Sequence, residues 1–207
     1  MTSVLSLRTA FNLFWLGRYM GRLEGLCELQ PLTDDRRAAR FAQAFALPAW
    51  NAETLHWLLH EPTQPVSILA SLQAIQCNTQ EVRGCLSRSA YRVLQQLWRL
   101  YEVDNPDYCP LLGQACEHLQ QALPELERTF WQLGLLVERL DRSLRLHESG
   151  QASVQALQAL VKKLPPGWAV IGQQVDQLGE APADANVFYA LCHELDELFA
   201  EGPAACC

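Results

Sequence analysis

Apolar residues recur at steps of three and four positions along nearly the whole chain, which is the spacing of amphipathic helices. Runs of alternating β-branched residues, which would indicate strands, do not occur, and Leu, Ala, Gln, Glu and Arg dominate. The pattern therefore predicts an all-α helical bundle, with proline, glycine and helix-capping residues at the breaks. The predicted helices cover 3–28, 34–46, 51–60, 66–84, 87–102, 110–123, 124–148, 151–163, 167–178 and 184–200.

The most regular stretch runs from Leu112 to Leu144, where apolar residues alternate steps of four and three as in a heptad seam. Pro124 lies inside this seam, and proline is tolerated in the first turn of a helix. We therefore expect either two successive helices or one kinked helix. The seam should pack inside the chain's own bundle. An intermolecular coiled coil, which would make the protein a self-assembling scaffold, is the alternative.

The first helix, 3–28, is apolar on two nearly opposite sides of the helical wheel, so it should lie at the centre of the bundle. Its longest uncharged stretch, 9–17, is too short to cross a bilayer, and we expect no membrane span. Between the two apolar stripes runs a strip of small residues where another helix backbone could come close. The strip consists of Ala10, Gly17, Gly21 and Gly25.

Two arginines of the first helix, Arg18 and Arg22, project from one of its apolar stripes. A buried guanidinium group needs a carboxylate partner. Glu24 cannot serve Arg22 within the same helix, because two positions are about 200° apart on the wheel. Their partners must therefore come from another part of the fold.

A later helix repeats the sequence of the first. The segment GRYMGRLE (17–24) aligns with GLLVERLD (134–141), with glycine, arginine, leucine and a carboxylate in register. The repeat indicates a degenerate duplication. The helices 3–28 and 124–148 are then two related core helices, and we expect them to lie side by side around a local pseudo-twofold axis.

This arrangement supplies the missing partners. As a hypothesis, Arg22 reaches Glu138 or Asp141, and Arg139 reaches Glu24. These five residues are our candidates for holding the two core helices together.

Composition narrows the class of protein. The 207 residues suit one domain, expected over 1–200, with a mobile tail at 201–207. A net charge of −7 gives no electrostatic attraction to nucleic acid or to anionic membranes, so we expect neither as a partner. No secretory pattern precedes the first helix, so a cytoplasmic location is expected. The eight cysteines are scattered over helical segments and are expected to be reduced thiols.

Residues that could carry chemistry are few. No glycine-rich phosphate loop occurs, so we expect no nucleotide cofactor on this chain. His56 and His60 have a spacing that could hold zinc, but no clear further ligand accompanies them, so no metal site is predicted. The remaining polar candidates could converge into an anion pocket, or could form only structural ion pairs. They are Arg18, Arg22, Asn78 and Arg83.

The two related segments resemble the alpha-E family, all-helical domains of bacteria with a recurring Glu-Arg motif. Members begin with N-L-F/Y-W-x-G/A-R-Y-x-E-R-A-E and carry F-x-x-G-R-x-x-E-R-A-D later. This chain has NLFWLGRYMGRLE and FWQLGLLVERLD, and its 65–102 segment resembles the family's middle helices. It departs from the pattern at Gly21, where the family has glutamate, at Leu135, where it has arginine, and at Gln76.

The resemblance implies a function by association. Members accompany circularly permuted ATP-grasp proteins, which form amide or peptide bonds through acyl phosphates. This chain is therefore expected to be an accessory subunit of such a ligase, acting on a peptide or an amino acid, with ATP and Mg on the partner. The alternatives are a stand-alone enzyme with the arginine-lined pocket, or the scaffold described above.

Overall fold

The computed structural model describes residues 5–100, 107–180 and 184–200, and this part of the chain contains ten α-helices and no strand, which confirms the all-α prediction. None of these helices is long and apolar enough to cross a membrane. The helices are α1 (Leu7–Leu29), α2 (Asp35–Ala44), α3 (Ala52–His60), α4 (Ile68–Glu81), α5 (Arg88–Arg99), α6 (Cys109–Ala122), α7 (Glu125–Arg145), α8 (Gln151–Val161), α9 (Ala169–Glu180) and α10 (Ala185–Ala200). Short 3-10 turns, η1 (Arg83–Cys85) and η3 (Pro166–Trp168), precede α5 and α9.

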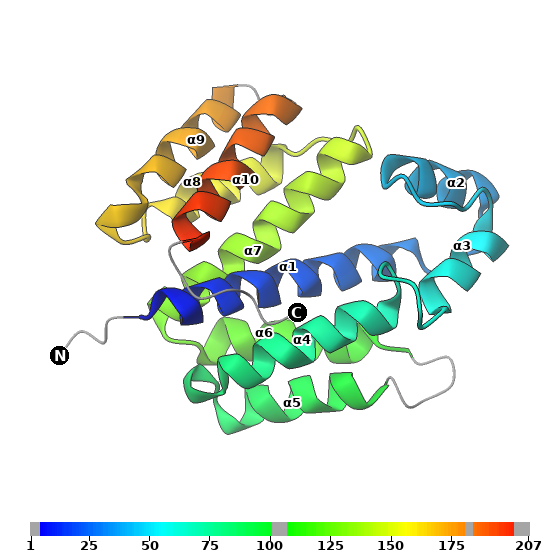
Figure 1. The fold of residues 1–207 in the computed structure, drawn as a ribbon, viewed down its shortest axis with the longest axis horizontal. Helices are drawn as coiled ribbons and strands as arrows, with labels where there is room; N and C mark the ends of the chain where they lie inside the picture. The colour runs from blue at the N-terminus through cyan, green and yellow to red at the C-terminus, as the bar shows by residue number, and fades with distance from the viewer. Residues whose placement is uncertain (1–4, 101–106, 181–183, 201–207) are drawn as a thin grey trace.

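Helices α1 and α7 cross at the centre of the molecule (Figure 1). Helices α4, α5 and α6 cover one side of this pair, and α8, α9 and α10 cover the other. Helices α2 and α3 lie beyond the C-terminal end of α1, next to the C-terminal end of α7. The related core helices predicted over 3–28 and 124–148 are therefore present, side by side, as α1 and α7.

The crossing of α1 and α7 depends on two glycines. A Cβ atom on Gly17 would overlap the backbone carbonyl of Trp131, and one on Gly134 would overlap the carbonyl of Phe14. The two contacts are equivalent, because the sequence repeat aligns Gly17 with Gly134 and Phe14 with Trp131. The backbones therefore pack around the local pseudo-twofold axis that the repeat predicted.

The heptad seam continues through two helices, α6 and α7, which are separated at Pro124. Proline fits this break because it cannot donate a backbone hydrogen bond. The seam packs within the bundle, as expected. Its buried members are Leu112, Leu119, Leu123, Phe130, Leu133, Val137 and Leu140.

The last helix closes the bundle through aromatic contacts. The ring of Phe199 lies 5.3 Å from Phe11, 5.2 Å from Phe14 and 5.0 Å from Trp168, measured between centroids. Edge and tilted contacts at such distances are favourable for aromatic pairs. The segment 201–207, predicted to be a mobile tail, lies outside the described residues.

One prediction about the cysteines is wrong. Cys27, near the end of α1, forms a disulfide with Cys109 at the start of α6. The fold brings their Cα atoms to 5.7 Å, within the range that a disulfide can bridge. Their separation of 82 positions in the sequence gave no sign of this proximity. The other described cysteines are thiols, namely Cys77, Cys85, Cys116 and Cys192.

Replacing Gly134 with alanine should lower the free energy of unfolding by about 3 kcal/mol, because the new methyl group would push α7 away from α1. Gly172 in α9 provides the matched control, since a Cβ there would meet no atom within 4 Å. Gly172→Ala should be neutral or stabilise by about 0.5 kcal/mol through helix propensity. Urea unfolding measures both. Equal effects of the two substitutions would contradict the close crossing.

The disulfide predicts that a protease digest made without reductant contains a peptide in which Cys27 and Cys109 are linked. Reduction, or Cys109→Ser, should lower the melting temperature, because closing so long a loop stabilises by up to about 4 kcal/mol. Cys85→Ser serves as the control and should leave the melting temperature unchanged. Failure to find the linked peptide in air-oxidised protein would refute the pairing.

Candidate functional site

A buried carboxylate, Glu138 of α7, lies between two arginines of α1. Its side chain is 6% exposed. Arg18 Nε donates a 2.6 Å hydrogen bond to Oε2 of Glu138, and Arg22 Nε donates one of 3.1 Å to Oε1. Of the two partners predicted for Arg22, the structure selects Glu138. We call these three residues the Glu138 cluster.

The charges of the cluster determine the protonation state of Glu138. Burial alone would raise the pKa of this carboxyl group, but the charges and hydrogen bonds of Arg18 and Arg22 outweigh burial and lower the pKa below its ordinary value of 4.5. Glu138 is therefore ionised at neutral pH. A carboxylate held in this way is a poor general acid.

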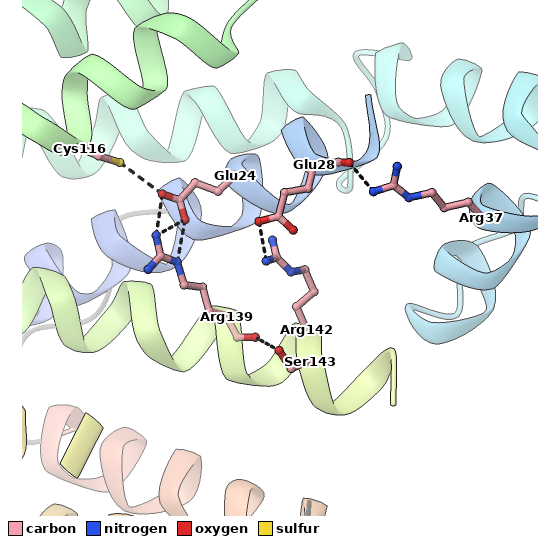
Figure 2. A network of polar contacts seen from close by, with 7 residues as sticks. All are labelled: Glu24, Glu28, Arg37, Cys116, Arg139, Arg142 and Ser143. Carbon is pink, nitrogen blue, oxygen red and sulfur yellow. Dashed lines mark hydrogen bonds and ion pairs between the residues drawn. The ribbon is translucent and has the colours of Figure 1, made fainter. Parts of the chain in front are cut away.

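The second predicted pair joins the helices on the other side of α1. Arg139 binds Glu24 through two hydrogen bonds, of 2.9 Å from Nε and 3.0 Å from Nη2 (Figure 2). The thiol of Cys116 on α6 donates to the same carboxylate over 3.7 Å. Burial and the charge of Glu24 raise the pKa of Cys116 to about 12, so this thiol is not a nucleophile at neutral pH.

Asp141 does not bind Arg22. It accepts a 2.8 Å hydrogen bond from Nε of Arg145, one turn further along α7, and its other oxygen lies 4.0 Å from Nη2 of Arg18. Arg145 in turn lies over the ring of Phe45 at the end of α2. Asp141 thus extends the Glu138 cluster towards α2.

The two halves of the duplication share their packing but not their polar contacts. The symmetry equivalent of the Arg18–Glu138 contact is the one between Leu135 and Gly21, and these two residues do meet. A Cβ on Gly21 would lie 3.3 Å from Cδ1 of Leu135. Two of the three departures from the family pattern, Gly21 and Leu135, are therefore the two sides of one contact, where an apolar contact replaces a charged one.

The proposed anion pocket does not assemble as predicted. Arg18 and Arg22 meet at Glu138, but neither of the cavities that they line contains Asn78 or Arg83. Asn78 is buried and donates to the carbonyl of Ala74 in its own helix. The guanidinium of Arg83 lies 4.9 Å from the ring centre of Tyr91. The fold separates these positions because α4 packs on a different side of α1.

No metal centre is apparent in the described ranges, where no three His, Cys, Asp or Glu residues come together to bind a metal ion. The rings of His56 and His60 stack on each other, with centroids 4.0 Å apart. Nδ1 of His60 faces the carbonyl oxygen of His56 at 2.8 Å, so this nitrogen is already occupied.

The sequence reasoning missed two arginines of α7 that the structure places beside the cluster. Arg145 could have been found, because it follows Asp141 by four positions, the spacing of an ion pair on a helix. Arg142 had no such signal. It pairs with Glu28 over 2.9 Å across the helix crossing, and Arg37 donates to the backbone carbonyl of the same glutamate (Figure 2).

The site is thus suited to binding and not to proton transfer. Its carboxylates are paired with arginines, which cannot act as acids or bases because they stay protonated. Cys192 lines a cavity with Arg18, and burial together with nearby carboxylates raises the pKa of its thiol to about 11, although the charge of Arg18 opposes this. The groups that remain available to bind a ligand are terminal guanidinium nitrogens of the arginine side chains.

The fold and the site define an all-helical domain whose two central helices are joined by ion pairs between arginine and glutamate. The chain belongs to the Alpha-E family, described as a predicted alpha-helical domain with a conserved ER motif, which matches residues 5–171. Neither a curated protein nor a solved structure shows a significant match. The resemblance aligns Glu138-Arg139 with this motif. Adjacent residues of a helix point about 100° apart, so each can reach a different side of α1.

Glu138→Gln should lower the free energy of unfolding by about 3 kcal/mol at neutral pH, because it leaves two arginines without their shared carboxylate. The folded-state pKa of Glu138 is lowered, so its contribution is present above 4.5 and is lost as the pH falls through the folded-state value. The gap between wild type and variant should therefore narrow in acid. Urea unfolding across this pH range measures it.

The control for this prediction is Glu148→Gln. Glu148 is exposed and lies 3.7 Å from Arg40, and such a pair contributes less than about 1 kcal/mol. A Glu138 variant that is no less stable than the Glu148 variant would show that the cluster does not hold α1 and α7 together.

Proposed function

We propose that this chain is an accessory helical subunit of an ATP-grasp-type ligase that forms an amide or peptide bond on a peptide or an amino acid. ATP and Mg bind to the partner, and this chain contributes binding surfaces. The proposal also places the complex in the cytoplasm and gives this chain no role in binding nucleic acid or membranes. Membership of the Alpha-E family supports the proposal, together with the association that the family resemblance implies.

The observation that carries the accessory role is the state of the site. Its carboxylates are paired with arginines, and burial raises the pKa of both cysteines near it. Bond formation driven by ATP needs a phosphate-binding loop, and the sequence has no glycine-rich loop of this kind. A partner that binds ATP and carries out the chemistry accounts both for the paired groups of the site and for the lack of such a loop in the sequence.

Two alternatives receive less support. A stand-alone enzyme with a pocket of Arg18, Arg22, Asn78 and Arg83 would need these residues on one cavity, but Arg18 and Arg22 line different cavities and neither cavity includes the other two residues. A scaffold that assembles through the heptad seam would need that seam on the surface, but most of it is buried within the chain. The Cys27–Cys109 disulfide weighs against the cytoplasmic location, because disulfides are rare in reducing compartments.

The surface around α3 is our proposed contact with the ligase. The faces of α1 and α7 are poor candidates for this contact, because other helices cover both sides of this pair. Trp50 and Trp57 are 70% and 59% exposed, and tryptophan contributes disproportionately to protein interfaces. Both residues belong to the segment that forms α3 and its N-terminal flank.

The tagged protein, purified from its native host, should bring an ATP-grasp protein with it, identified by mass spectrometry. Trp57→Ala should reduce the recovery at least tenfold, because an interface tryptophan contributes about 2 kcal/mol or more. Tyr189→Ala removes another exposed aromatic residue, on α10, and should leave the recovery unchanged. Turnover of ATP by this chain alone, or recovery without an ATP-grasp protein, would refute the accessory role.

A further inference from the structure

A cavity of about 220 Å³ lies beside the Glu138 cluster, and its two walls differ in chemistry. One wall is apolar and comes from α2, α3 and the α2–α3 connection, with Phe41, Phe45, Leu47 and Leu59. The other wall is charged and comes from α1 and α7. Its residues are Arg22, Glu138, Asp141, Arg142 and Arg145.

Two of these arginines present unused donors. Arg22 and Arg145 bind their carboxylates through Nε, and their terminal nitrogens make no hydrogen bond within the described chain. Their side chains are 41% and 36% exposed, so a ligand in the cavity could approach them. The two terminal nitrogens of a guanidinium group form parallel hydrogen bonds to a carboxylate or a phosphate.

Aromatic rings hold these two side chains in place. The guanidinium carbon of Arg22 lies 5.2 Å from the ring centre of Tyr19, and that of Arg145 lies 5.5 Å from the ring centre of Phe45. Together with the ion pairs at Nε, these contacts restrict the rotation of the arginines before any ligand binds. Such preorganisation lowers the entropic cost of binding.

A third arginine of the cavity carries an orphaned donor. Nη1 of Arg142 is buried and has no hydrogen-bond partner among the described residues, whereas Nη2 of the same side chain binds Glu28 (Figure 2). A buried cationic donor without an acceptor is unfavourable. An anion in the cavity would reduce that cost by bringing negative charge close to Arg142.

The charges around the cavity leave one positive charge uncompensated, which suits a monoanion. Three arginines line the cavity against two carboxylates, namely Arg22, Arg142 and Arg145 against Glu138 and Asp141. The volume lies below the range of about 300 to 1,000 Å³ that is typical of drug-sized ligands, so the occupant is small. The apolar wall requires that it also carry a hydrocarbon group.

We propose that this cavity binds a small monocarboxylate with an apolar side chain. The carboxylate binds to the terminal nitrogens of Arg22 and Arg145, and the hydrocarbon group packs against Phe41, Phe45 and Leu47. The inference does not rest on the accessory role, because every residue of the site belongs to this chain.

Calorimetric titration of the full chain with phenylacetate and with hexanoate tests the proposal. Each acid is compared with its neutral amide, phenylacetamide or hexanamide, and acetate and inorganic phosphate are titrated separately. At least one of the two acids should bind at millimolar concentration or below. Its amide, acetate and phosphate should each bind at least tenfold more weakly. The amide lacks the charge, acetate lacks the apolar group, and phosphate carries the wrong charge and shape.

Variants locate the site. Arg22→Gln and Arg145→Gln should each weaken binding of the acid at least tenfold. Arg128→Gln is the matched control: it removes the same charge from a half-buried arginine of α7 that lies outside the cavity, and it should change binding less than twofold. Leu47→Trp should abolish binding by filling the cavity without altering any charge.

Several outcomes would overturn the proposal. One is that neither acid binds, and another is that acid and amide bind equally. A third is that phosphate binds as tightly as the acid, which would indicate a general anion site. A fourth is that Arg128→Gln weakens binding as much as Arg22→Gln does. Thermal unfolding of each variant separates loss of the site from loss of the fold. Leu47→Trp is informative in this respect because it keeps every ion pair of the Glu138 cluster.

Discussion

The close approach of α1 and α7 is the constraint on which the rest of this structure depends. Because Gly17 and Gly134 let each helix touch the backbone of the other, side chains one and two turns further along are brought within hydrogen-bonding distance across the crossing. At such short range Arg18 and Arg22 donate to Glu138 through Nε, which leaves the terminal nitrogens of Arg22 available. The glycines thus determine both the stability of the core and the availability of the arginines.

The duplication explains why the charged groups are unevenly distributed. An ideal pair of repeats would place the same ion pair on both sides of the crossing. Here one side keeps its arginines and its glutamate, whereas the other has Gly21 against Leu135. Losing both partners together avoids leaving an unpaired charge in the core, which would cost far more than losing the pair. The Arg18–Glu138 ion pair is therefore present on one side of the crossing only, whereas the Arg139–Glu24 pair lies on the other side.

Much of this architecture could be predicted from the sequence, because it is encoded in local periodicity and in one internal repeat. Helix positions follow from apolar spacing, and the partners of Arg22 and Arg139 follow from the register of the two glycines. What could not be predicted depends on where distant segments meet. No periodicity in the sequence indicates the Cys27–Cys109 disulfide, the position of Arg83 beside Tyr91, or the apolar wall that α2 and α3 contribute to the cavity. The position of Asn78 could not be predicted for the same reason, since nothing in its helix indicates which side of α1 it faces.

The disulfide has a consequence for how the molecule would respond to force. Cys27 and Cys109 lie near the two ends of a segment that holds α2, α3, α4 and α5. Under tension applied at the two ends of the chain, the load would pass from one cysteine directly to the other, and these four helices would lie outside the stretched path. The apolar wall of the cavity beside the Glu138 cluster belongs to the loop that the disulfide closes. Force would therefore reach this cavity only through α1 and α7.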